Sequence, residues 1–322
     1  MRRREFIALM GASVALPFAA TAQQAGRTYR LGCLWPFPRD APIAIAFFDE
    51  LRRHGFIEGQ NLTVEFRVYG LRVDLISQYA AELVRAQPDV LYVGGRDAIR
   101  AVQHATKAIP ILGIADDMVG QGLVDSLARP NGNTTGVSIL ATELDGKRQE
   151  ILIEAVPGLR RMAALADAHT TGAKLDALQE AARARNIELS IYRVAKGEEI
   201  AAAIDMAKAS GAATLNVLAS PMLDANRKLV MDRVAALRLP AMYPWPELAE
   251  EGGFAAYGPR LIGLFRDLLP RQLIKLFRGA KIADIPIEQP TKFELVINLK
   301  TANAMGVTVP EALLVRADKL IE

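Results

Sequence analysis

Apolar side chains follow two alternating patterns along this chain: short continuous runs, and stripes with the spacing of one helix face. In the stripe from Ala44 to Leu51 the apolar residues lie three and four positions apart, and Gly55 follows, so this segment predicts a helix that ends before the glycine. The run Leu62–Tyr69 then predicts a strand. Helical stripes lie between most of the further strands predicted at Leu31–Trp35, Val90–Val93, Ile109–Ala115 and Thr135–Leu140.

The same alternation begins again near residue 160. Strands separated by helices imply parallel sheets with right-handed crossovers. Two such series of comparable length predict an α/β fold with two doubly wound parallel-sheet lobes. The strands predicted in the second series are Met162–Asp167, Glu188–Val194, Ala213–Ala219, Ala241–Tyr243 and Phe254–Tyr257.

The C-terminal part indicates that the chain passes between the lobes more than once. A helical segment at Leu261–Gly279 contains Pro270, which predicts a kink, and a late strand is predicted at Phe293–Asn298. We expect a first lobe of residues 26–141 plus about 259–290 and a second of residues 142–258 plus about 291–322. The segments between them would form a multi-strand hinge.

The first residues predict an export signal. Arg2, Arg3 and Arg4 precede the apolar run Phe6–Ala20, which is shorter than the ~20 residues of a spanning helix. Small residues at 20–22 fit a cleavage site, so we expect residues 1–22 to be removed after export to the periplasm by a twin-arginine or general secretory route. Because this segment holds three Arg and one Glu, the net charge of +3 falls to +1 without it. Nothing in that charge indicates a nucleic-acid partner.

The motifs of common enzymes and metal sites are absent from the sequence. The one cysteine, Cys33, lies in an apolar strand pattern, where a buried thiol behaves as a small hydrophobic group. His54, His104 and His169 are far apart and form no HExxH or Cys/His pattern. Neither a GxxxxGK[ST] phosphate loop nor a GxSxG elbow occurs. We therefore expect a protein that is not an enzyme and holds neither a metal nor a cofactor.

The loops that follow the predicted strands carry the candidate site residues, because ligands of open parallel sheets bind beyond the carboxyl ends of the strands. These loops combine aromatic rings, hydroxyls, charges and helix N-termini, which suits a small polar or zwitterionic solute. The candidates are Trp35, Arg39, Gly95, Arg96, Asp116, Asp117 and Ser138 in the first series, and His169, Thr170, Ser220, Met222, Tyr243, Trp245, Glu247 and Tyr257 in the second.

Three roles are expected of these candidates. Arg96 lies at a strand end beside a predicted helix N-terminus, where an anionic ligand group is favoured. The alternatives are structural: a salt bridge for the arginine, loop capping for the aspartates and core packing for the tryptophans. A ligand amine would be received by Asp116, Asp117 or Glu247, and an apolar body would be flanked by Trp35, Tyr243 and Trp245.

Three segments resemble one bacterial family. They are Gly59-Gln60-Asn61 with Val64-Glu65, RPNGNTTGVS at Arg129–Ser138, and QPTKFELVINLKTANAMGVTVP at Gln289–Pro310, of which the last is the most specific. The family is that of the ABC-transporter substrate-binding proteins related to tryptophan/tyrosine-uptake binding proteins, and the resemblance covers essentially the whole mature chain. It implies a type I periplasmic binding fold with three crossovers, closure around a solute, a membrane permease as partner, and a monomer.

The strand-end loops depart from that family. Gly94-Gly95-Arg96-Asp97-Ala98 stands where many members have a GGTPA sequence, and Asp167–Thr171 replaces an Asn-Pro-Asn type of loop. The fold expectation is unaffected, but the resemblance by itself does not predict specificity for tryptophan or tyrosine. We predict an exported protein that captures an amino acid or an aromatic or organic acid and delivers it to an ABC importer. The alternatives are a periplasmic sensor that signals to a membrane receptor and an exported enzyme of α/β fold.

Overall fold

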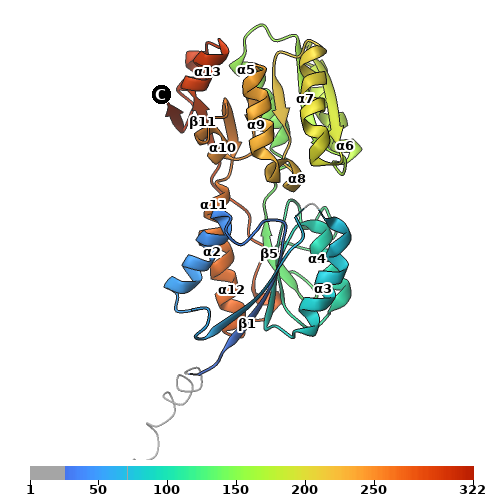
Figure 1. Ribbon diagram of the computed structural model, residues 1–322, viewed down its shortest axis with the longest axis vertical. Helices are drawn as coiled ribbons and strands as arrows, with labels where there is room; N and C mark the ends of the chain where they lie inside the picture. The colour runs from blue at the N-terminus through green and yellow to red at the C-terminus, as the bar shows by residue number, and fades with distance from the viewer. Residues whose placement is uncertain (1–25, 71) are drawn as a thin grey trace, which may run out of the picture.

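Two α/β lobes make up the protein, one above the other in Figure 1. The computed structural model describes residues 26–70 and 72–322, so the predicted export signal lies outside the described residues. Each lobe is built on its own sheet, and the predicted two-lobe α/β architecture is confirmed.

The first sheet has five parallel strands in the order β2-β1-β3-β4-β5. One face is covered by α2 (Pro42–Arg53) and α12 (Leu269–Phe277), and the other by α3 (Ile76–Arg85) and α4 (Arg96–Ala105). Two helices far apart in sequence, the blue α2 and the orange α12, therefore pack side by side (Figure 1). The strands are β1 (Tyr29–Trp35), β2 (Leu62–Val68), β3 (Val90–Gly94), β4 (Ile111–Ala115) and β5 (Thr134–Ser138).

The second sheet has seven strands in the order β12-β11-β10-β9-β8-β6-β7. Five of them follow the predicted parallel arrangement, whereas β11 and β12 run in the opposite direction, so that β10 and β11 pair antiparallel. The direction changes because β11 is entered from the other lobe. The strands are β6 (Arg161–Asp167), β7 (Glu188–Val194), β8 (Leu215–Val217), β9 (Ala241–Tyr243), β10 (Ala255–Gly258), β11 (Glu294–Asn298) and β12 (Lys319–Ile321).

Helices cover both faces of this second sheet. Their apolar sides form separate core clusters, one built on α7 and α9 and the others on α5, α6 and the C-terminal helices. The helices are α5 (Asp145–Ala155), α6 (Gly172–Arg183), α7 (Ile200–Ala209), α8 (Pro221–Ala225), α9 (Arg227–Ala236), α10 (Pro246–Glu250), α13 (Leu299–Met305) and α14 (Glu311–Leu314), with a short 3-10 turn at Gly197–Glu199. Two further 3-10 turns, Val73–Leu75 and Ile282–Asp284, belong to the first lobe.

The chain crosses between the sheets at residues 139–144, 259–260 and 289–293. After the second crossing it forms α11 (Leu261–Gly263), a π-helical turn at Leu264–Leu268, and α12. Pro270 lies in the first turn of α12, so the predicted irregularity takes the form of a π-helical turn immediately before the proline. On its way to the third crossing, Glu288 pairs with Val137 at the edge of the first sheet.

Candidate functional site

The carboxyl ends of the parallel strands in the two sheets face each other, because the chain leaves β5 and β10 at these ends to cross to the other lobe. Asp116 follows β4 in the first lobe, and Lys174 lies in the first turn of α6 in the second. The Lys174 Nζ atom lies 3.2 Å from Asp116 Oδ2, so an ion pair joins the two lobes directly. The region between the strand ends is therefore the candidate ligand site.

Asp116 is held by the first crossover as well as by this ion pair. The Thr142 backbone N–H donates to Asp116 Oδ1 at 2.9 Å, and the Thr142 hydroxyl donates to Oδ2. Lys174 Nζ also donates to the Thr142 hydroxyl oxygen. The carboxylate side chain of Asp116 remains 18% exposed, so it is fixed in position but accessible.

Asp117 and Ser138 shape the loop around Asp116. Asp117 Oδ1 accepts a hydrogen bond of 2.8 Å from the Gly120 backbone N–H, which closes a turn. The buried Ser138 hydroxyl donates to the Asp116 carbonyl and accepts from the Met118 N–H, both at 3.1 Å. The capping role considered for the aspartates applies to Asp117, and Ser138 acts from below the surface.

Gly95 and Arg96 form the N-terminus of α4, as the sequence pattern predicts. Gly95 has a φ of +93°, and a Cβ atom there would lie 2.7 Å from the Tyr69 hydroxyl, so glycine is required. Tyr69 in turn donates to the Gly94 carbonyl at 2.8 Å. The half-buried Arg96 pairs with its neighbour Asp97 at 2.9 Å. This salt bridge is the structural role considered above as the alternative to a ligand contact for Arg96. The Arg96 guanidinium remains near the end of β3.

Trp35 and Arg39 are placed differently from the prediction. Trp35 is the last residue of β1 rather than a loop residue, and only 1% of it is exposed. Its indole packs against aromatic rings of the lobe core, so packing rather than ligand stacking accounts for it. Arg39 lies over the Phe48 ring and pairs with Glu58, which turns its side chain to the outside of the first lobe.

In the second lobe, His169, Thr170 and Ser220 gather around Asp167 at the end of β6. Asp167 Oδ1 lies 2.8 Å from His169 Nδ1, and Oδ2 accepts from the Ser220 hydroxyl at 2.7 Å. The Thr170 backbone N–H donates to the Asp167 carbonyl at 2.9 Å. Ser220 is also the N-cap of α8, where its Oγ accepts from two backbone N–H groups. The structure thus brings these three predicted residues together at Asp167, through its carboxylate for His169 and Ser220 and through its backbone carbonyl for Thr170.

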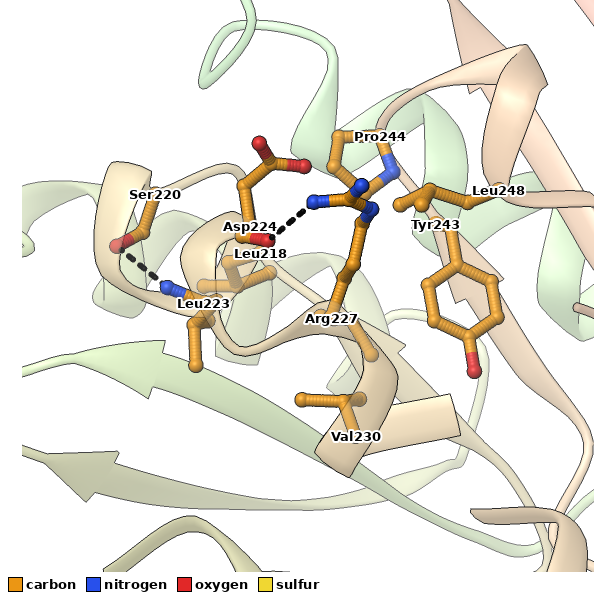
Figure 2. Close-up of a pocket in the computed structure, with 10 residues that line it drawn as sticks. Leu218, Ser220, Leu223, Asp224, Arg227, Val230, Tyr243, Pro244 and Leu248 are labelled. Atoms are coloured by element: carbon orange, nitrogen blue, oxygen red, sulfur yellow. Dashed lines mark hydrogen bonds between the residues drawn. The ribbon is translucent and has the colours of Figure 1, made fainter. Parts of the chain in front are cut away.

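Beside them is a small cavity between α8, α9 and the loop after β9 (Figure 2). Ser220 and Tyr243 line it, whereas Met222 points into the core. Tyr243 is 1% exposed, and burial raises the pKa of its hydroxyl. Two charged residues that sequence reasoning missed, Asp224 and Arg227, also line the cavity; burial raises the pKa of Asp224 to about 6.

Trp245, Glu247 and Tyr257 lie near the second crossover. Trp245 is 7% exposed within the core of the lobe, so core packing again replaces the predicted ligand stacking. Glu247 Oε1 accepts from the Ile262 backbone N–H at 3.3 Å, which links α10 to α11 across the crossover. Burial raises the pKa of Glu247. The Tyr257 ring is half-buried and lies near Phe293 on the third crossover.

The sequence analysis did not predict a role for Arg148, a residue of α5 whose guanidinium is fully buried. It pairs with Asp145 at 2.7 Å and donates to the carbonyls of Ala141, Pro244 and Tyr257. It therefore ties the first crossover to the loop after β9 and to strand β10. No sequence signal indicates this role, because α5 buries Asp145, Arg148 and Gln149 among its apolar residues and so shows no clear apolar stripe. Lys174 did carry a signal: a cation in the first turn of a helix opposes the helix dipole.

Neither a candidate metal site nor a membrane-spanning helix occurs in the described ranges. Within residues 26–70 and 72–322, no three His, Cys, Asp or Glu side chains are grouped so that they could hold a metal ion. No helix in the same part of the chain combines the length and apolarity needed to cross a membrane.

The two lobes, the three crossovers and the facing strand ends define a class, the two-lobed binding proteins of the type I periplasmic fold. The chain belongs to the ABC transporter substrate-binding proteins, whose family profile matches residues 43–321. The predicted family, fold and solute-binding class are thereby confirmed. The chain is a substrate-binding protein and not an enzyme, and proteins of this family work outside the cytoplasm.

Individual relatives agree with this assignment. The tyrosine-binding protein of Clostridioides difficile is 24% identical over 269 residues, which cover 80% of this chain and 75% of the relative. A conserved domain protein from Vibrio cholerae has a TM-score of 0.82 at 22% identity, with 91% of this chain and 100% of that chain covered. The ABC domain from Streptococcus pneumonia in complex with L-Trp has a TM-score of 0.78 at 22% identity and the same coverage.

Proposed function

We propose that the protein captures a small zwitterionic or polar solute, an amino acid or an organic acid, between its lobes. It would act in the periplasm as a monomer, after cleavage near Ala22, and deliver the solute to the permease of an ABC importer. The observation that carries the proposal is that the carboxyl ends of both sheets meet, with Asp116 and Lys174 in contact across the gap. The names of the tyrosine-binding relative and of the L-Trp complex favour amino acids.

In this proposal the ligand docks first on one lobe, and rotation about the three crossovers then buries it. Closure depends on the ligand because the ligand binds the closed form more tightly than the open form. The accessible polar groups would form the ligand surface: Gly95, Arg96 and Asp116 on the first lobe and Thr170, Lys174 and Ser220 on the second. The permease would recognise the closed form.

A thermal-shift panel tests the ligand class. The protein would first be unfolded and refolded to remove any bound ligand, and then exposed to amino acids, aromatic acids, short fatty acids, dicarboxylates, sugars and nucleosides. A ligand present at about 100 times its Kd stabilises the folded protein by about 2.7 kcal/mol. We expect this shift from at least one amino acid or organic acid. Stabilisation by sugars or nucleosides alone would contradict the proposed ligand class.

A further inference from the structure

The ion pair between Asp116 and Lys174 differs from the other ion pairs of the described residues. Its partners come one from each lobe, outside the crossover segments, whereas the remaining pairs lie within a lobe or involve a crossover residue. The pair also lies at the strand ends that face the gap. It therefore occupies the place where a solute would contact both lobes at once.

The two members of this pair are fixed to different degrees. Asp116 accepts two hydrogen bonds from Thr142 in addition to its contact with Lys174. Lys174 has a long flexible side chain that is 37% exposed, and its other contact is the Thr142 hydroxyl. Because the lysine end of the pair is the more exposed, water can solvate the ammonium group when it leaves Asp116. Asp116 is thus a fixed acceptor with one exchangeable donor.

The position of Lys174 within its helix points the same way. It lies in the first turn of α6, where the helix dipole disfavours a cation. That first turn contains no acidic residue. An anionic partner outside the helix therefore accounts for the placement of Lys174, and Asp116 supplies that partner in the structure described here.

Charges around Asp116 argue against an anionic ligand group at that position. Burial raises the pKa of Asp145, and the charge of the nearby Asp116 raises it further. The nearby Arg148 already pairs with Asp145 and donates to three carbonyls. A second anion beside Asp116 would depend on Lys174, which already pairs with Asp116. A cation replacing Lys174 keeps the charges balanced.

We infer that Asp116 and Lys174, which pair with each other in the structure described here, bind the two charged ends of a zwitterionic solute. The ammonium group of the solute replaces Lys174 at Asp116, and its carboxylate receives the released Lys174. This inference rests on the proposed function and narrows its substrate class to solutes that carry both charges, such as α-amino acids. A solute with one charge leaves either Asp116 or Lys174 without a partner at the cleft.

Calorimetry with three related probes tests the exchange. L-tyrosine carries both charges, tyramine lacks the carboxylate, and 3-(4-hydroxyphenyl)propionate lacks the amine. We expect the unmodified protein to bind L-tyrosine at least tenfold more tightly than either analogue. In Lys174→Met, L-tyrosine should lose affinity by about 10- to 100-fold. Tyramine should gain affinity, because Asp116 no longer has a competing cation.

The opposite signs for two ligands distinguish this role from a general loss of structure. Asp116→Asn should weaken L-tyrosine and tyramine and leave the propionate little changed. The matched control is Lys228→Met, which breaks the exposed pair of Lys228 with Asp232 on α9 and should change none of the three affinities. Equal losses for L-tyrosine and tyramine in Lys174→Met, or no loss for either, would overturn the inference alone. Failure of the unmodified protein to bind any amino acid would overturn the proposed ligand class as well.

Discussion

Arg148 and Asp145 are joined by a hydrogen bond of 2.7 Å inside the second lobe, where the Arg148 side chain is 0% and the Asp145 side chain 6% exposed. Burial raises the pKa of Asp145 to about 6 even though the guanidinium favours its charged form. The pair is nevertheless well satisfied, because Arg148 also donates to three carbonyls that belong to the first crossover, to the loop after β9 and to strand β10. The side of the second lobe that faces the first lobe is therefore organised around the buried guanidinium of Arg148.

Replacing Arg148 by Met should destabilise the protein strongly. The substitution leaves the Asp145 carboxylate buried without its cation and removes the donors of three carbonyls, which together cost about 3–5 kcal/mol. Urea unfolding would measure the loss. The control is Lys147→Met, since Lys147 is the adjacent residue, is 47% exposed and pairs only with Glu150 on the same helix. A loss below about 1 kcal/mol in Arg148→Met would show that the pair does not organise the lobe.

Asp224 should make stability depend on pH. Burial raises its pKa from 3.8 to about 6, so the folded protein takes up this proton at a higher pH than the unfolded chain does. Protonation therefore stabilises the fold as the pH falls from about 6 to 4, and the ionised carboxylate costs stability above pH 6. Asp224→Asn should raise the free energy of unfolding by about 1–3 kcal/mol at pH 7.5. The gain should vanish near pH 4.

Denaturant titrations at several pH values would check this dependence. Asp232→Asn is the control, because Asp232 lies on the neighbouring helix with 65% of its side chain exposed. Its effect should be small at every pH. A constant gain for Asp224→Asn between pH 4 and 8 would contradict a raised pKa.

Gly258 should tolerate no side chain. A Cβ atom there would lie 2.1 Å from the Pro244 carbonyl oxygen, which is an acceptor of Arg148. Gly258→Ala must shift the loop after β9 and should cost about 2–3 kcal/mol. Gly263→Ala lies a few residues further along, in α11, with no atom nearer than 3.8 Å to the added methyl group. Alanine in a helix is favoured over glycine, so this control should gain about 0.5–1 kcal/mol in thermal unfolding.

Trp35→Phe should separate packing from ligand stacking. The indole is buried, and its Nε1 has no hydrogen-bond partner among the described residues, so the loss of packing is partly offset by removal of an unpaired N–H. We expect a loss of about 1–2 kcal/mol in stability. Affinity for L-tyrosine in calorimetry should stay within about twofold. A tenfold weaker affinity at unchanged stability would restore the stacking role.

Most of the fold could be predicted from apolar spacing. Strands such as β6 bury a continuous apolar run, and helices such as α2 and α4 bury one regular face, so both leave a regular pattern in the sequence. Short helices such as α8 and α10 and the polar α5 left none. The antiparallel pairing of β10 with β11 could not be predicted, because it depends on the third crossover rather than on either strand.

The candidate site, like the fold, could be predicted only in part. The sequence by itself determined that polar residues follow the strands, and parallel topology then requires those residues to gather at one edge of each sheet. It could not determine side-chain directions. Trp35 packs among aromatic rings of the core, and Arg39 pairs with Glu58. Both side chains are therefore directed away from the region between the lobes. Only the tertiary structure brought Asp116 to Lys174 and Arg148 to its three carbonyl acceptors. Charged groups far apart in sequence acquire such partners only when the lobes fold together.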